Sequence, residues 1–180
     1  MVMVLFADGF EEIEALAVVD ILRRGGVEVK MVSIQAEKWV CGAHGIRVET
    51  DIAAGDGLPA ETEAVILPGG GQGTERLKQS AWVEDTLRQA QEKGLYLCAI
   101  CAAPSVLGKY GYLKGKKAIC YDGFENQLTG AEITDSAVVT DGKVITSKGA
   151  GTAHLFAFEI LKQLKGEATA QQVKESMKYE

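Results

Sequence analysis

The residue best suited to covalent chemistry in this sequence is the cysteine at position 101. It lies in LYLCAICAAPSVL, where the apolar stretch 94–100 is predicted to be a strand and the small residues after it a helix. A thiol at the carboxyl end of a strand lies beside the free N–H groups and the positive dipole of the next helix, and both favour thiolate over thiol. Cys101 is therefore a candidate nucleophile with a lowered pKa.

A cysteine nucleophile requires groups that stabilise the negative charge formed during the reaction. Gly69, Gly70 and Gly71 follow another predicted strand, and glycines let backbone N–H groups approach a ligand because they carry no Cβ. Together with the N–H of Ala102 they could form an anion site, although a tight turn between strand and helix explains the run equally well. The segment LPGGGQGTERL does not match a phosphate-binding loop.

Three glutamates, Glu11, Glu12 and Glu14, open the first predicted helix. Carboxylates at this end stabilise the helix dipole, and we expect only this role for Glu11 and Glu12. Glu14 lies near the apolar face formed by positions 13, 16 and 17, so it is predicted to point inward. Because burial raises the pKa of a carboxyl group, Glu14 is expected to keep a proton near neutral pH and to exchange it with a thiolate.

The other cysteines give weaker predictions. Cys98 and Cys101 have the spacing of a redox dithiol, but Cys98 falls inside the predicted strand, which favours a buried apolar role. Cys120 ends a predicted strand and is a candidate resolving thiol. Cys41 is expected to be structural or exposed.

The two histidines do not indicate a metal site. His44 and His154 lack ligand spacing, and no second cysteine pair is present, so we predict neither a metal nor an organic cofactor. His44 is expected in a solvated turn, 42–45. His154 heads a predicted helix and is expected at the surface or at an interface.

Apolar strands alternate with amphipathic helices along the chain, which predicts a parallel sheet covered on both faces. In such α/β sheets, ligands bind at the carboxyl ends of the strands. The predicted strands are 1–6, 27–34, 39–42, 45–51, 63–70, 94–100 and 116–120, followed by a hairpin over 136–147 with Asp141–Gly142 as its turn. The predicted helices are 11–26, 74–93 with a break near Ser80, a helix directly after Cys101, 154–164 and 171–177.

Composition limits the function further. The chain has 180 residues, 47% of them hydrophobic, and we expect one domain over 1–180. The net charge of −6 argues against a specific nucleic-acid partner. No stretch is long enough to span a membrane, and the apolar MVMVLF has no basic region before it, so a cytoplasmic location is expected.

Four segments carry a resemblance to a known family. FADGFEEIEA, AVILPGGGQGTERL, CAICAAPSVL and SKGAGTAHLFAFEIL, in this order, resemble the ThiJ/PfpI superfamily and within it the Parkinson-associated protein deglycase (DJ-one) subgroup. The resemblance covers residue 1 to about residue 165. It implies a flavodoxin-like three-layer sandwich of the class I glutamine amidotransferase type, assembled as a homodimer.

The resemblance also implies roles for individual residues. Cys101 would be the reactive cysteine on a strained nucleophile elbow, Glu14 its protonated partner, and the N–H groups of Gly70 and Ala102 the anion site. The remaining near-site residues would be Gly69, Cys120, Tyr121, Gly149 and Ala150. Relatives are credited with glyoxalase or deglycase activity on small reactive carbonyl compounds, with oxidation sensing, and with chaperone or peptidase activity.

The chain departs from the family pattern at several positions, among them the one beside the cysteine. Some relatives place a histidine beside the cysteine, whereas this chain has Tyr121. A tyrosine has a pKa of about 10 and is a poor base at neutral pH, so protease-type catalysis is disfavoured. A glyoxalase or deglycase that needs no cofactor and a non-enzymatic sensor of Cys101 oxidation both remain open.

Overall fold

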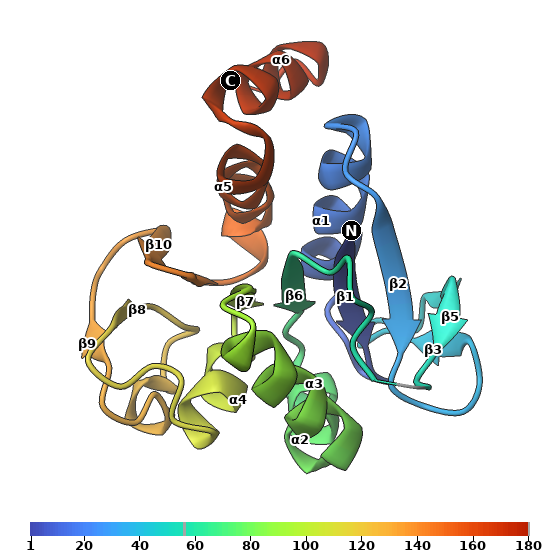
Figure 1. The fold of residues 1–180 in the computed structure, drawn as a ribbon, viewed down its shortest axis with the longest axis vertical. Coiled ribbons are helices and arrows are strands. Elements are labelled where there is room, and N and C mark those ends of the chain that lie inside the picture. Colours follow the sequence, from blue (N-terminus) through green and yellow to red (C-terminus); the bar gives the residue numbers. More distant parts are fainter. Residues whose placement is uncertain (56, 180) are drawn as a thin grey trace.

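A seven-stranded sheet forms the centre of the protein in the computed structural model, which describes residues 1–55 and 57–179 (Figure 1). The strand order is β10-β11-β7-β6-β1-β2-β5, and every neighbouring pair is parallel except β10 and β11. The predicted flavodoxin-like α/β architecture is therefore confirmed. Residue 180, the last of the predicted domain, lies outside the described residues.

The strands of this sheet are short and mostly buried, as their apolar sequences predict. Each residue of β1, β6 and β11 is buried, because helices cover both faces. The strands are β1 (Val2–Phe6), β2 (Val29–Ser33), β5 (Ile52–Ala53), β6 (Ala64–Leu67), β7 (Tyr96–Ile100), β10 (Val138–Asp141) and β11 (Val144–Ser147).

The helices divide between the two faces, which gives three layers. α1 (Glu12–Arg24), α5 (Ala153–Lys165) and α6 (Glu167–Ser176) pack on one core, in which Phe6 and Phe156 are fully buried. α2 (Gly71–Gln79), α3 (Ala81–Glu92) and α4 (Pro104–Lys109) contribute to the second core, around Leu5 and Leu97. Alternate residues of β1, β6 and β7 enter opposite cores, so both faces of the central part of the sheet are buried. No helix in the described part of the chain has the length and apolar character to span a membrane.

The predicted break in the second helical region is confirmed. Ser80 separates α2 from α3 and caps α3, because its hydroxyl oxygen accepts a hydrogen bond from the N–H of Val83 at 3.3 Å. α2 begins at Gly71, three residues earlier than the sequence predicts. The glycine run therefore leads directly into a helix N-terminus.

Three details of the predicted strands need correction. Residues 116–120 contribute only β8 (Lys117–Ala118), which pairs with β9 (Glu132–Ile133) in a separate two-stranded sheet. In the hairpin, Asp141 pairs with Val144, so the two loop residues are Gly142 and Lys143 and not Asp141 and Gly142. β5 was not predicted. The remaining elements are β3 (Trp39–Cys41), which pairs with β4 (Arg47–Glu49), and the short 3₁₀ turns η1 (Glu125–Gln127) and η2 (Ala150–Thr152).

Candidate functional site

Cys101 lies immediately after β7, at the carboxyl edge of the sheet. Its φ of 64° is in the left-handed region, which costs a non-glycine residue about 1–2 kcal/mol. Two hydrogen bonds hold this conformation: the N–H of Cys101 donates to the Ser147 carbonyl at 3.0 Å, and the N–H of Tyr121 donates to the Cys101 carbonyl at 2.8 Å. The sharp turn has the geometry of the strained elbow that the resemblance implies.

Glu14 is brought to Cys101 by the first turn of α1. Its side chain is 1% exposed, and one carboxyl oxygen, Oε2, accepts a hydrogen bond from the N–H of Gly69 at 2.8 Å. A Cβ on Gly69 would lie 2.5 Å from that oxygen and 2.6 Å from the Cβ of Cys101. Position 69 must therefore be glycine for the two reactive side chains to meet.

The backbone N–H groups of Gly70 and Ala102 act on the Cys101 sulfur and lower the pKa of its thiol, as expected for an anion site. Gly70 has a φ of 90°, and a Cβ on it would collide with the carbonyl oxygen of Gly9. This left-handed, crowded position is suited only to glycine. The glycine run thus supplies both the N–H that binds Glu14 and an N–H that binds the sulfur.

The two titratable groups of the site share a proton. Burial raises the pKa of Glu14 to about 7, although hydrogen bonds from Cys101 and Gly69 act in the opposite direction. Burial also raises the pKa of Cys101 to about 12, and the neighbouring Glu14 carboxylate adds to this effect. The predicted lowering of the thiol pKa is therefore wrong, because burial and the carboxylate charge outweigh the N–H groups of Gly70 and Ala102.

The two pKa values define how many protons the Glu14–Cys101 pair holds. Between about pH 7 and pH 12 the pair holds one proton, and thiolate exists whenever that proton lies on the carboxyl group. The second carboxyl oxygen, Oε1, is buried and has no hydrogen-bond partner among the described residues. The site therefore brings a buried carboxyl group next to the Cys101 sulfur.

Tyr121 and Cys120 lie next to the site but differ in orientation. The backbone of Tyr121 is tied to Cys101, and its side chain is 54% exposed. Cys120 is buried in the core formed with α2, α3 and α4, whereas Cys101 packs against the opposite core. Burial also raises the pKa of Cys120 to about 11. The structure gives no support to Cys120 as a resolving thiol.

Gly149 and Ala150 line the opposite side of the same region. A hollow of about 380 Å³ lies between Tyr121 and the segment 148–152. A Cβ on Gly149 would lie 3.3 Å from the Tyr121 ring. The sequence-predicted near-site residues are thus placed together, beside the strand end that carries Cys101.

Two other cysteines lie apart from this chemistry. Cys98 is fully buried, and burial raises the pKa of its thiol far above the usual value. It has the apolar role that its place in the strand predicts. Cys41 is half-buried, and its thiol donates to the carbonyl of Gly42 with a sulfur–oxygen distance of 3.7 Å.

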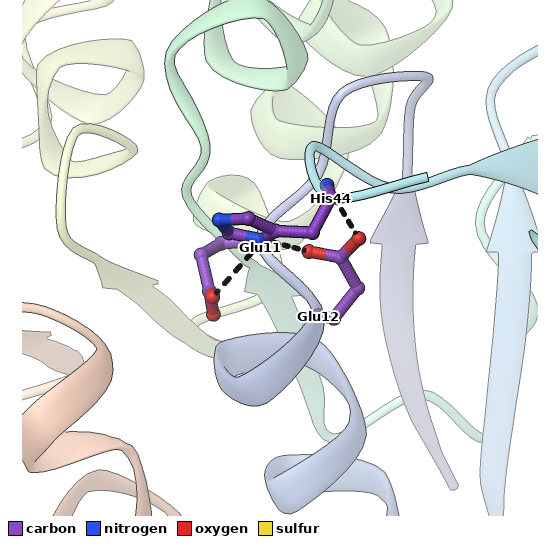
Figure 2. A group of neighbouring side chains, drawn as sticks. All are labelled: Glu11, Glu12 and His44. Carbon is purple, nitrogen blue, oxygen red and sulfur yellow. Dashed lines mark hydrogen bonds and ion pairs between the residues drawn. The ribbon is translucent and has the colours of Figure 1, made fainter. Parts of the chain in front are cut away.

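One group of side chains in the described residues has ligand atoms close enough for a metal ion: Glu11, Glu12 and His44, within 4.8 Å of one another (Figure 2). Figure 2 shows the His44 ring between the two carboxyl groups, with its Nδ1 2.7 Å from Glu12 Oε2 and 4.0 Å from Glu11 Oε1. The N–H of His44 donates to the second oxygen of Glu12 at 2.7 Å. Glu11 also caps α1, since its Oε2 accepts from the N–H of Glu14.

These contacts correct the roles predicted for Glu12 and His44. Glu12 is 5% exposed and fixes the turn 42–45 against α1, so it does more than stabilise the helix dipole. The His44 ring is solvated, as predicted, but its pKa is raised by the hydrogen bond to Glu12 and by that carboxylate's charge. Burial alone would raise the pKa of Glu12, and the bonds from His44 lower it below the usual value. The two glutamates therefore favour the protonated form of His44.

His154 is half-buried and stacks on Tyr179, with ring centroids 5.6 Å apart. The stack lies between the start of α5 and the chain end after α6. The ring therefore packs against another part of the same chain.

Known proteins with similar sequences were found over almost the whole chain. Residues 1–163 match the profile of the DJ-1/PfpI family. The chain is 36% identical to Protein DJ-1 homolog A of Arabidopsis thaliana over 96% of its length, but spans only 45% of that relative. It is 34% identical to a glutathione-independent glyoxalase of Caenorhabditis elegans (87% of this chain, 83% of that one). It is 30% identical to a deglycase of Pyrococcus abyssi (91% and 99%).

A solved structure agrees with this relationship. The C103A mutant of a DJ-1 superfamily protein from Salmonella typhimurium superposes with a TM-score of 0.95 at 32% identity, covering 99% of this chain and 98% of that one. Both the matched length and the shared fold point to one family. The chain belongs to the DJ-1/PfpI family.

Proposed function

We propose that the protein is a cysteine-dependent glyoxalase or deglycase that acts on 2-oxoaldehydes such as methylglyoxal or on their early glycation adducts. The observation that carries this proposal is the buried Glu14–Cys101 pair, which holds one proton above about pH 7. Two relatives named as a glyoxalase and a deglycase support it.

The reaction follows from what this pair can do. The Cys101 thiolate adds to the aldehyde carbon, and Glu14 gives its proton to the oxygen, forming a hemithioacetal. The resulting carboxylate removes the hydrogen from that carbon and returns a proton to the neighbouring one, which leaves a thioester of a 2-hydroxy acid. Water then releases the acid and regenerates the thiol, so methylglyoxal and water give lactate.

The N–H groups of Gly70 and Ala102 have a second role in this scheme. They stabilise the sulfur anion before it attacks the aldehyde, and they stabilise it again when water releases the sulfur from the thioester. Tyr121 supplies only a backbone N–H, to the Cys101 carbonyl, and its phenol is not required as a base. Protease-type Cys–His catalysis is disfavoured, because position 121 carries a tyrosine and not a histidine.

Turnover of methylglyoxal by the purified protein tests the proposal, with lactate measured by NMR. Cys101→Ser and Glu14→Gln should each abolish lactate formation, whereas Cys41→Ser, a cysteine substitution away from the site, should retain it. Absence of lactate, or its persistence in Cys101→Ser, would refute the enzymatic function. Decay of a methylglyoxal–lysine adduct, measured while free methylglyoxal is scavenged, separates deglycation from glyoxalase activity.

A second candidate function, a sensor of oxidation, uses the same residues. A sulfinate at Cys101 would place its charge against the N–H groups of Gly70 and Ala102 and beside protonated Glu14. Mild peroxide followed by mass spectrometry should add two oxygens at Cys101 and none at buried Cys98. Oxygen spread over all four cysteines would exclude this function.

The proposal includes a cytoplasmic homodimer. Both were expected from the sequence and its family resemblance, and both are open to measurement. Sedimentation equilibrium should give twice the chain mass of 19.2 kDa. Fractionation of the native cell should place the protein with cytoplasmic markers.

A further inference from the structure

Three hydrogen bonds join Glu11, Glu14 and Gly69 into a closed ring. The N–H of Glu14 donates to Glu11 Oε2 at 2.7 Å, the N–H of Glu11 donates to the Gly69 carbonyl at 3.0 Å, and the N–H of Gly69 donates to Glu14 Oε2 at 2.8 Å. Glu11 and Glu14 lie at the start of α1, whereas Gly69 belongs to the glycine run after β6. The ring therefore holds the helix that carries Glu14 against the loop whose Gly70 N–H acts on the Cys101 sulfur.

The Glu11 carboxylate is directed on both sides. Its Oε2 accepts the bond from Glu14, and its Oε1 lies 4.0 Å from Nδ1 of His44, toward which it points in Figure 2. The Glu11 side chain is only 14% exposed, although it precedes the first residue of the helix. Because little water reaches this contact, a lost bond to the Glu14 N–H would not be fully replaced by solvent.

A glutamate is an unusual cap for a helix. Serine, threonine, aspartate and asparagine are preferred there, because their short side chains reach the N–H two or three residues on. α3 follows this preference with Ser80. Glutamate has an additional methylene group to order, so a local preference for capping alone does not explain Glu11. Residues that break a local rule are expected at functional sites.

We propose that Glu11 is a positioning residue: its carboxylate and its backbone N–H hold Glu14 and Gly69 so that the Glu14 carboxyl group meets the sulfur of Cys101. The ring ties Oε2 of Glu14 to the loop, whereas Oε1 is buried and has no hydrogen-bond partner among the described residues. An N–H donor stabilises negative charge on the oxygen that it contacts, so the proton of Glu14 belongs on Oε1. This inference rests on the proposed function and assigns the residue that places its acid.

The pH dependence of Cys101 alkylation by iodoacetamide tests the inference without turnover. The sulfur forms a bond to carbon and iodide leaves, so the rate follows the amount of thiolate; mass spectrometry assigns the label to Cys101. In the wild type the rate should rise through the Glu14 pKa of about 7 and then level off, because the Glu14–Cys101 pair gives up its first proton there. Glu14→Gln cannot take the proton of the sulfur, and its rate should keep rising above pH 8.

Three variants separate the position of Glu14 from the stability of the fold. Glu11→Ala removes the cap and should give the profile of Glu14→Gln, because a displaced carboxyl group no longer takes the proton. Glu11→Gln keeps an oxygen of the same reach without the charge that helps to raise the pKa of Glu14, so its plateau should remain and begin at a lower pH. Ser80→Ala is the matched control: it removes the cap of α3, lowers the urea midpoint as Glu11→Ala does, and should leave the profile unchanged.

Other titratable groups face this ring within the described chain. Glu12 and His44 lie beside Glu11, and Cys101 lies beside Glu14. His44→Gln therefore checks that the inflection does not report the histidine, and it should leave the inflection in place. In lactate formation, Glu11→Ala should lower kcat roughly 100-fold with little change in KM, because a displacement of about 1 Å has this effect on a reacting group. Glu11→Gln should keep most of the wild-type kcat.

Three outcomes would overturn the inference. The first is a Glu11→Ala profile that keeps the wild-type plateau. The second is a loss of the plateau in Glu11→Gln, and the third is a Glu11→Gln plateau that begins at the wild-type pH, since a carboxylate in contact with Glu14 must influence its ionisation. The last two remain decisive if Glu11→Ala does not fold. Failure of the proposed function looks different: if the wild type forms no lactate while the alkylation profiles change as expected, glyoxalase activity is refuted and the positioning role of Glu11 is supported.

Discussion

Replacing Glu14 by glutamine should remove the activity and, above pH 7, stabilise the fold. The pKa of Glu14 is raised by burial from 4.5 to about 7. Because an acid with a raised pKa is harder to ionise in the folded protein than in the unfolded chain, its ionisation destabilises the fold. The destabilisation is absent below the unfolded pKa of 4.5 and complete above about pH 7.

The magnitude follows from the two pKa values. Their difference, about 7 minus 4.5 or about 2.5 pH units, corresponds to about 3 kcal/mol at roughly 1.4 kcal/mol per unit. The side chain is 1% exposed, so little solvent screening reduces this figure. Glutamine does not titrate. The difference in the free energy of unfolding, Glu14→Gln minus wild type, should therefore increase by about 3 kcal/mol between pH 4.5 and pH 8.

Urea unfolding at pH 4.5, 6, 7 and 8 measures this difference. Groups that titrate in both proteins cancel, so only Glu14 contributes to its pH dependence. Glu37→Gln, an exposed carboxylate in the loop between β2 and β3, is the matched control and should show a flat difference. A flat difference for Glu14→Gln too would refute the raised pKa of Glu14, and with it the shared proton on which the mechanism depends.

Three further predictions concern the geometry around this pair. Gly69→Ala places a methyl group between Glu14 and Cys101, so it should cost about 1–3 kcal/mol in urea unfolding and abolish lactate formation; retained activity would contradict the close approach. Cys101→Gly should be more stable than Cys101→Ala by about 1 kcal/mol, because only glycine accepts the φ of 64° without strain; equal melting curves would refute this. The pKa of His44, followed by NMR, should exceed its usual 6.5 and fall in Glu12→Gln. A histidine whose pKa is raised in the folded protein stabilises the fold at pH values below its unfolded pKa, and this stabilisation is lost as the pH rises through the folded pKa. Glu12→Gln should therefore also weaken the pH dependence of the free energy of unfolding between these two pKa values.

Much of the architecture was readable because it depends on local sequence patterns. Buried strands of four to six apolar residues, helices with one apolar face and the cap at Ser80 predicted the three layers in their chain order. The errors lie where pairing partners decide the structure. β8 and β9 have two residues each, and the one-residue shift of the hairpin loop depends on the register of Asp141 with Val144.

The candidate site was predicted as far as helix register and strand order allow. The apolar neighbours of Glu14 predicted that its side chain points inward. The position of Cys101 directly after a buried strand predicted that it lies at the carboxyl edge of the sheet. The pair formed by Glu12 and His44 was missed, because the two residues are 32 positions apart and meet only through the turn 42–45. Nothing in either local segment identifies its partner.

The predicted direction of the Cys101 pKa shift was wrong, and the reason lies in the second acid beside the sulfur. A helix N-terminus and two N–H groups lower the pKa of an accessible thiol, but here the sulfur is half-buried beside a second acid. Each acid raises the cost of ionising the other, so the pair holds one proton over a wide pH range. In the proposed mechanism, this proton moves from sulfur to Glu14 to give the thiolate and then to the substrate oxygen. The strain at Cys101 and the buried carboxyl of Glu14 therefore oppose stability at the point where they make the chemistry possible.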